Sequence, residues 1–239
     1  MKTAVCFTGT ARSLEYTYKN IQEKIIDPIG DCDVFLYIAE NPHSDKVHKY
    51  FEIPQVKLIK IEKEPEYEIN NYRFRPLWPS PKSISSRQIY IKMVKSREIC
   101  NDLLAQYEKD NNFTYDRVIF SRLDVKYFDS ISYFLDSLDL DHIHIPDFHN
   151  TFGNVIDGYN DRFAIGNREN MDKYFTVLKN IDEFLQQGGL VHAETLLKWH
   201  LDHSSVKVNK IPFRFSRVRP DGEEIENHLK NIQLVYSDT

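Results

Sequence analysis

An arginine and an aspartate stand two residues apart at the end of a predicted buried strand. The strand covers Asp116 to Ser121, and Arg122-Leu123-Asp124 follows it directly. Alternation along an extended chain places the side chains of Arg122 and Asp124 on the same side. A carboxylate can bind a divalent cation, and a guanidinium can bind a phosphate through paired hydrogen bonds. The pair therefore suits a metal-bridged diphosphate, and the alternative is an ion pair that seals the end of the strand.

Strands and helices alternate along the chain in an order that predicts a parallel sheet. Strands are expected over Thr3–Gly9, Cys32–Glu40 and Gln55–Lys63, with a helix over Ser13–Asp27 between the first two. This is a βαβ pattern. A long helix over Ser85–Asp110 then leads into the strand that ends at the charged pair. Later elements are expected over Ser132–Leu138, His142–Pro146, Arg162–Gly166, Arg168–Leu185, His192–His203, Val206–Pro212 and Phe213–Pro220.

This order of elements, with a short acidic motif after a mid-chain strand, resembles the GT-A glycosyltransferases, whose nucleotide-sugar site carries a D-x-D motif there. The resemblance implies a Rossmann-type, mostly parallel sheet flanked by helices. It also implies one domain over residues 1–239, with a nucleotide-binding half at 1–126 and an acceptor-side half at 127–239. The sequence departs from the motif because Arg122 stands at the first Asp position. Only Asp124 carries over as a ligand for Mn²⁺ or Mg²⁺, and Arg122 can itself neutralise phosphate charge.

The loop after the first strand is where GT-A proteins receive the nucleotide. Gly9 allows a ligand to approach the backbone closely, and the start of a helix favours anions. The donors expected there are Thr8, Thr10, Arg12 and Ser13. The alternative is a helix N-cap at Thr10 or Ser13 with Arg12 in solvent. Neither the P-loop nor the dinucleotide glycine motif is present, so ATPase and dinucleotide-fold functions lack their main support.

Two acidic residues are candidates for acid–base chemistry on the acceptor side. GT-A enzymes often place an acidic residue at the start of a late helix, and Glu194 has this position. A carboxylate there can take the proton of an attacking hydroxyl, with His192 as an alternative base. Helix-dipole stabilisation is the simpler explanation for Glu194. Asp161 precedes an apolar strand, a costly place for a charge unless Arg162 pairs with it, so it is the second candidate base or a group that binds a sugar hydroxyl.

Arg217 and Arg219 share one face of the last predicted strand. GT-A folds often close the diphosphate site with a C-terminal basic residue. Either arginine can stabilise the departing nucleoside diphosphate, where negative charge grows in the transition state. The alternative is an edge strand whose arginines lie in solvent.

The composition of the chain argues against several other classes of protein. The formal net charge of −5 argues against a general nucleic-acid binder. The sequence contains no run of 18 or more apolar residues, so it predicts no membrane span. Three widely spaced cysteines predict no disulfide framework. We therefore expect a cytoplasmic protein.

The resemblance predicts a hexosyl- or pentosyltransferase of the kind used in polysaccharide biosynthesis. It would move a sugar from a nucleoside-diphosphate sugar, such as a UDP-sugar, to a glycan or other hydroxyl acceptor. Direct displacement with inversion follows if Glu194 or Asp161 acts as a base. One alternative is a nucleotidyl- or phosphotransferase, which requires a second acidic metal ligand. Another is a non-catalytic nucleotide- or glycan-binding module that kept the fold and lost its metal site.

Overall fold

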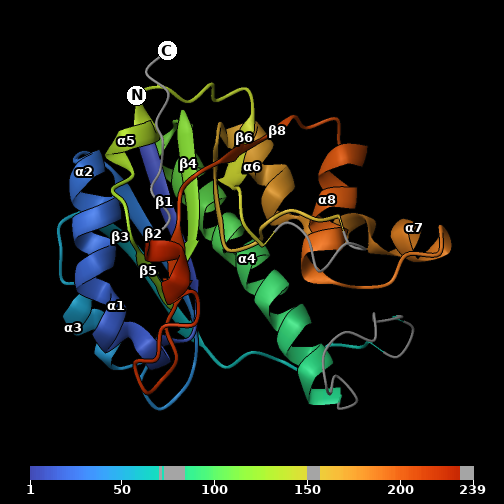
Figure 1. Cartoon of the computed structure of the whole chain (residues 1–239), viewed down its shortest axis with the longest axis horizontal. Coiled ribbons are helices and arrows are strands. Elements are labelled where there is room, and N and C mark those ends of the chain that lie inside the picture. The colour runs from blue at the N-terminus through green and yellow to red at the C-terminus, as the bar shows by residue number, and fades with distance from the viewer. Residues whose placement is uncertain (70–71, 73–83, 150–156, 232–239) are drawn as a thin grey trace.

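Strands from both halves of the chain form a seven-stranded sheet in the computed structural model, which describes residues 1–69, 72, 84–149 and 157–231 (Figure 1). The strand order is β3-β2-β1-β4-β7-β6-β8. β7 is antiparallel to both of its neighbours, β4 and β6, and the other neighbouring pairs are parallel. The strands are β1 (Thr3–Gly9), β2 (Asp33–Ala39), β3 (Val56–Glu62), β4 (Arg117–Arg122), β6 (Ile143–Pro146), β7 (Phe163–Gly166) and β8 (Val208–Ile211).

The central strands are buried on both faces. In β1, Ala4 and Cys6 belong to one hydrophobic core, whereas Val5 and Phe7 belong to the core on the opposite face. Strands that are covered on both sides read as nearly continuous apolar runs, which is typical of parallel sheets. The apolar runs that predicted these strands therefore reflect two separate helical layers.

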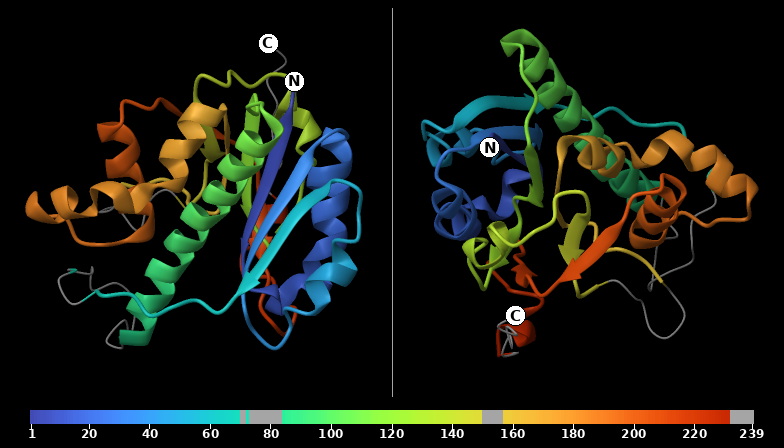
Figure 2. Two further views of the ribbon diagram at one scale, coloured as in Figure 1. Left: turned by 180° about the vertical axis from the view of Figure 1, so that it is seen from behind. Right: turned by 90° about the horizontal axis from the view of Figure 1, so that it is seen from above.

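Helices cover both faces of the sheet (Figure 2). α4 (Ile84–Asn111), α6 (Arg168–Phe175), α7 (Ile181–Gln186) and α8 (Ala193–His203) contribute to one core. α1 (Leu14–Ile21), α3 (Lys46–Tyr50) and α5 (Ser132–Leu135) contribute to the other. The predicted α/β architecture, a mostly parallel Rossmann-type sheet flanked by helices, is confirmed.

Two predicted helices differ from the observed ones. The first continues from α1 through a π-helical segment, Gln22–Ile26, to α2 (Asp27–Ile29), and ends at Gly30, whose φ of 73° favours glycine. The helix predicted over Arg168–Leu185 is interrupted at Thr176, where ψ is 36° and the hydroxyl donates to the Asp172 carbonyl. A side-chain hydroxyl that bonds to the preceding turn slightly destabilises a helix and often bends it, and the interruption falls at this residue.

The last predicted strand is shorter than expected. Only β9 (Phe215–Arg217) is formed, and it pairs with β5 (Val125–Tyr127) in a separate two-stranded sheet. β5 starts one residue after Asp124, and Val125 is the Cα partner of Arg217. This small sheet therefore brings a C-terminal arginine close to the charged pair.

Candidate functional site

The parallel pairing of β1 with β4 brings two remote segments to the same edge of the sheet. Thr8 is the Cα partner of Arg122, so the chain leaves both strands side by side. Gly9 then turns with a φ of 126°, in the region that favours glycine. Residues 9–13 and 122–124 thus converge, as the predicted anion site requires.

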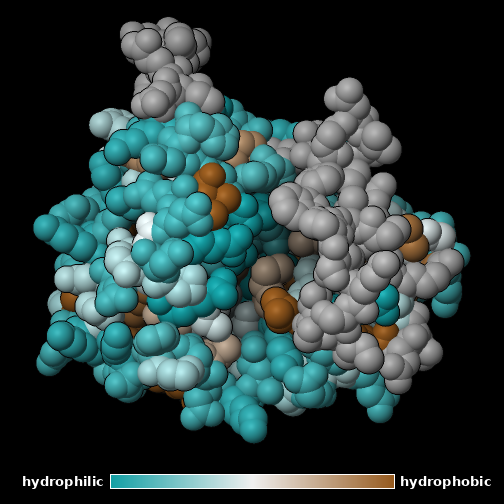
Figure 3. All heavy atoms as spheres, turned by 60° about the horizontal axis from the view of Figure 1, so that its bottom comes forward, coloured by the Kyte–Doolittle hydropathy of each residue, from teal (hydrophilic) through white to brown (hydrophobic). Residues whose placement is uncertain are grey.

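A cavity of about 230 Å³ lies where these segments meet. Ligands of open α/β sheets bind beyond the carboxyl ends of the strands, and the cavity occupies that position. Figure 3 shows this face, where hydrophobic side chains lie in a hollow of a mainly hydrophilic surface. The predicted residues that line the cavity are Thr8, Gly9, Thr10, Arg12, Arg122 and Asp124.

Seven further lining residues were not identified as site residues from the sequence. They are Ala39, Glu64, Ile89, Lys92, Met93, Ser96 and Leu123. Ile89, Lys92, Met93 and Ser96 recur at helical spacing along α4, a helix that was predicted without a functional face. Ile89 is 67% exposed, so the lining includes an exposed apolar side chain, which the sequence alone does not reveal.

Ser13 does not serve as a donor in the cavity. Its buried hydroxyl donates to the carbonyl of Val218, at 2.7 Å, and so ties the first loop to the C-terminal segment. Thr10 occupies the N-cap position with an extended backbone and makes no side-chain cap hydrogen bond. Thr10 therefore keeps its hydroxyl for the cavity, whereas Ser13 has a structural role.

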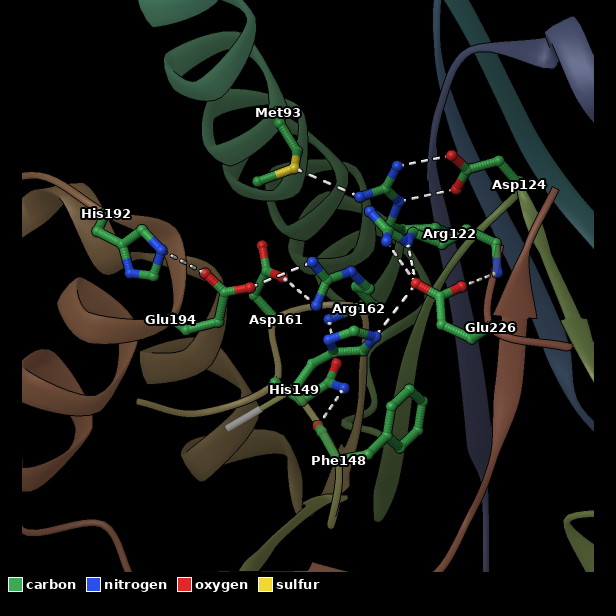
Figure 4. Close-up of polar contacts among 12 residues, drawn as sticks. Met93, Arg122, Asp124, Phe148, His149, Asp161, Arg162, His192, Glu194 and Glu226 are labelled. Atoms are coloured by element: carbon green, nitrogen blue, oxygen red, sulfur yellow. Dashed lines mark hydrogen bonds and ion pairs between the residues drawn. The ribbon is translucent and has the colours of Figure 1, made fainter. Parts of the chain in front are cut away.

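Arg122 and Asp124 form a paired contact at the cavity wall (Figure 4). The Arg122 Nε lies 2.8 Å from Asp124 Oδ1, and Nη2 lies 2.6 Å from Oδ2. Arg12 approaches the same carboxylate, with Nη2 3.9 Å from Oδ2. Burial would raise the pKa of Asp124, but Arg122, Arg12 and Arg217 outweigh it and hold that pKa below its usual value. The carboxylate is therefore ionised and surrounded by cations.

The contacts that Asp124 makes with these arginines do not fit its predicted role as a metal ligand. Both of its oxygens accept hydrogen bonds from Arg122, which has the charge that a cation would bring. Within the described residues, no group of three or more His, Cys, Asp or Glu side chains could hold a metal ion. The assignment of Mn²⁺ or Mg²⁺ remains a sequence-based prediction without support from this geometry.

Arg217 lies near the charged pair but is largely neutralised. Its Nε donates to Glu226 Oε1 at 2.6 Å, and its backbone N–H donates to Oε2 at 2.7 Å. His149 Nε2 lies 3.1 Å from the same carboxylate. Arg219, by contrast, is exposed, and its backbone N–H donates to the Glu223 carbonyl within a turn. The structure therefore brings Arg217 toward the site and leaves Arg219 outside it.

The Glu226 carboxylate should make stability depend on acidity. Burial would raise its pKa, but hydrogen bonds from His149 and Arg217 outweigh this and lower that pKa to about 2. A carboxyl group with a lowered pKa stabilises the fold above its unfolded pKa, near 4.5, and this contribution is lost as the pH falls toward 2. We expect Glu226→Gln to reduce the free energy of unfolding at pH 7 and to flatten its loss between pH 5 and 2. Denaturant unfolding across this range checks the result, with the exposed Glu223→Gln as control. Equal acid sensitivity in Glu226→Gln and wild type would contradict it.

Asp161, Arg162 and Glu194 form a second charged group. Arg162 lies between the two carboxylates, with Nη1 3.6 Å from Asp161 Oδ1 and Nη2 3.1 Å from Glu194 Oε1. His192 Nε2 is 3.3 Å from Glu194 Oε2. Figure 4 shows one band of charged side chains that runs from His192 and Glu194 to the Arg122 pair. The structure thus places both predicted acidic candidates in the same band of charged side chains as the Arg122 pair.

A close backbone approach holds the Asp161 loop against the start of α8. A Cβ built at Gly158 would lie 2.7 Å from the Glu194 Cβ and 2.8 Å from its carbonyl carbon, so only glycine fits there. The Tyr159 backbone N–H donates to the Glu194 carbonyl at 3.0 Å. Gly158 therefore positions Asp161 relative to Glu194. Residues 150–156, which precede this loop in the sequence, lie outside the described residues.

Asp161 is deeply buried, at 3% exposure, and Oδ2 has no hydrogen-bond partner among the described residues. Burial would raise the pKa of Asp161, but Arg162, Arg97 and Arg122 outweigh it and hold that pKa below its usual value. Arg97, on α4, is itself 1% exposed. Arg97 could not be identified from the sequence, because a single arginine within a helix carries no local signal of burial.

The fold and the cavity together define an α/β protein with a pocket at the carboxyl edge of its sheet, and the lining of this pocket includes three basic side chains. Over residues 1–220 the sequence matches the family described as "Domain of unknown function (DUF7796)", and the chain belongs to this family. Comparison with curated proteins gave no match. Within the described residues, no helix is long and apolar enough to cross a membrane.

Three solved structures are similar at low identity. The apo form of the glycosyltransferase GlyE from Streptococcus pneumoniae TIGR4 has a TM-score of 0.47 and 14% identity, with 88% of this chain and 45% of that chain covered. A second GlyE structure has a TM-score of 0.45 and 14% identity, with 87% and 45% covered. Apo mouse xyloside xylosyltransferase 1 has a TM-score of 0.49 and 12% identity, with 88% and 85% covered. The chain thus spans less than half of GlyE, and similarity at this level establishes no activity.

Proposed function

We propose that this protein is a glycosyltransferase that uses a nucleoside-diphosphate sugar. The observation that carries the proposal is the shared cavity of the first loop and the Arg122 corner, which has the cations and hydroxyls that a diphosphate requires. Asp161 lies within the electrostatic reach of Arg122, and Arg162 joins Asp161 to Glu194, so a sugar attached to the diphosphate would extend toward this acidic pair. An anion site adjoining a carboxylate is the arrangement that glycosyl transfer needs.

Glu194 is the base in this proposal. An acceptor hydroxyl attacks the anomeric carbon, the bond from that carbon to the phosphate oxygen breaks, and the hydroxyl proton passes to the Glu194 carboxylate. The nucleoside diphosphate leaves with the electron pair, and Arg12 and Arg122 offset its charge. Asp161 suits this step less well because a base works best with a pKa near the working pH, and the pKa of Asp161 is held below its usual value.

Incubation with a panel of UDP-, GDP- and dTDP-sugars tests the proposal. We expect release of nucleoside diphosphate from one donor class and transfer of the sugar to a hydroxyl acceptor, followed by mass spectrometry of the products. Parallel reactions with chelator or with Mn²⁺ record any metal requirement. Tight donor binding without turnover, with every acceptor tried, would instead favour the non-catalytic binding module.

A further inference from the structure

The guanidinium group of Arg122 occupies the place where a divalent cation would meet Asp124. Two of its nitrogens, Nε and Nη2, donate hydrogen bonds to the two carboxylate oxygens of Asp124, at 2.8 and 2.6 Å. Asp124 is 7% exposed, so it has little surface left for another partner. A cation that bound Asp124 would have to displace Arg122 and leave a second positive charge beside it.

The cavity lining already carries more positive than negative charge. Arg12, Lys92 and Arg122 are basic, whereas Glu64 and Asp124 are acidic. Burial raises the pKa of Glu64, so its ionised form is less favourable in this lining than in solvent. A diphosphate fits a lining of this kind, because its charge needs cationic donors rather than further acceptors.

Arg12 and Arg122 both retain donors for a ligand. The Arg12 side chain is 42% exposed, and its contact with Asp124, at 3.9 Å, leaves most of its N–H groups free of that carboxylate. Arg122 Nη1 lies 3.7 Å from the Met93 sulfur, which is a weak acceptor. A phosphate oxygen would replace such a partner readily, because a charged acceptor makes the stronger hydrogen bond.

We propose that this site binds the diphosphate of its donor without a divalent cation. Arg12 and Arg122 neutralise the phosphates, and Asp124 is a positioning residue that holds the Arg122 guanidinium group at the cavity wall. The inference rests on the proposed function, since it describes how the same pocket holds the leaving group. It differs from the metal-bridged arrangement that a D-x-D motif implies. Arg122, which stands where that motif has its first aspartate, supplies the positive charge in place of a metal ion.

Calorimetric titration of the full chain with UDP and with GDP, in chelator and in Mn²⁺, tests the proposal. We expect one nucleotide to bind with a Kd that differs by less than about threefold between the two buffers. Arg12→Ala should weaken binding roughly 10- to 100-fold in both buffers, the usual loss for a charged hydrogen bond. The control is Lys19→Ala, which removes the same charge from an exposed site on α1 that does not line the cavity.

Asp124→Asn separates a positioning residue from a metal ligand. A positioning role predicts weaker binding in both buffers, by roughly tenfold, while the far-UV circular dichroism spectrum is retained. A metal ligand would lose only the part of the affinity that Mn²⁺ supplies. Asp102→Asn, at an exposed position of α4, is the matched control.

The outcomes distinguish the two proposals. Nucleotide binding that requires Mn²⁺ in the wild type would overturn the cation-free site and leave the glycosyltransferase proposal standing. Binding of neither nucleotide in either buffer, together with no turnover in the donor panel, would overturn the glycosyltransferase proposal itself.

Discussion

Glu194→Gln is expected to lower the rate of sugar transfer by about 100-fold or more, because loss of a general base typically costs a factor of 10² to 10⁴. Glutamine keeps the shape of the side chain and can still accept a hydrogen bond from Arg162, so the fold should be unchanged. Donor affinity should change by less than about twofold, because Glu194 lies outside the lining of the phosphate cavity. Initial rates at saturating donor, with a parallel binding titration, measure both quantities.

Glu183→Gln provides the matched control for this variant. Glu183 is an exposed residue of α7, and its carboxylate accepts a hydrogen bond from Gln187. The control should transfer sugar at the wild-type rate. Undiminished turnover in Glu194→Gln would remove Glu194 from the chemistry and move the base role to Asp161 or His192.

Asp161→Asn should have the largest effect on stability. The Asp161 carboxylate is the buried counter-charge of Arg162, at 3.6 Å, and it lies within the electrostatic reach of Arg97. Removing one partner of a buried ion pair typically costs about 3–5 kcal/mol. Arg162 would keep Glu194, at 3.1 Å, but the buried Arg97 would lose a counter-charge. For a chain of this size each kcal/mol shifts the Tm by about 2–4 °C, so we expect the Tm to fall by at least about 6 °C.

Thermal unfolding of Asp161→Asn beside Asp157→Asn measures this effect. Asp157 belongs to the same loop, but its side chain is 68% exposed and pairs only loosely with Lys198, at 3.6 Å. Its substitution should leave the Tm within about 2 °C of the wild-type value, as is usual for surface changes. An Asp161→Asn variant with wild-type stability and no turnover would show that Asp161 acts in the chemistry rather than as a counter-charge.

Sequence patterns predicted the parts of the site that follow a strand end. A βαβ unit makes β1 and β2 parallel, and the long helix before β4 returns the chain so that β4 can run parallel to β1. Parallel neighbours end at one edge, so Thr8 and Arg122 had to come together once this pairing formed. The charged pair itself was visible in the sequence because a cation and a carboxylate are unusual at the end of an apolar run.

Other parts of the site depend on contacts between distant residues that no local pattern encodes. Glu226 lies in a polar tail beyond the last predicted strand, yet it is 2% exposed and bonded to Arg217 and His149. The functional face of α4 is equally hidden, because helical spacing predicts which residues share a face but not what that face meets. Arg97 was missed for the same reason.

The sequence by itself determined the class of fold and the chemistry available at the strand ends. Hydrophobic periodicity is local, so it records which residues must be buried and in which kind of element. Only the tertiary structure decided how the charges were paired, and above all that Arg122 satisfies both oxygens of Asp124. Electrostatic pairing depends on distance and burial across the whole molecule, and these are fixed only when the sheet and its helices pack together.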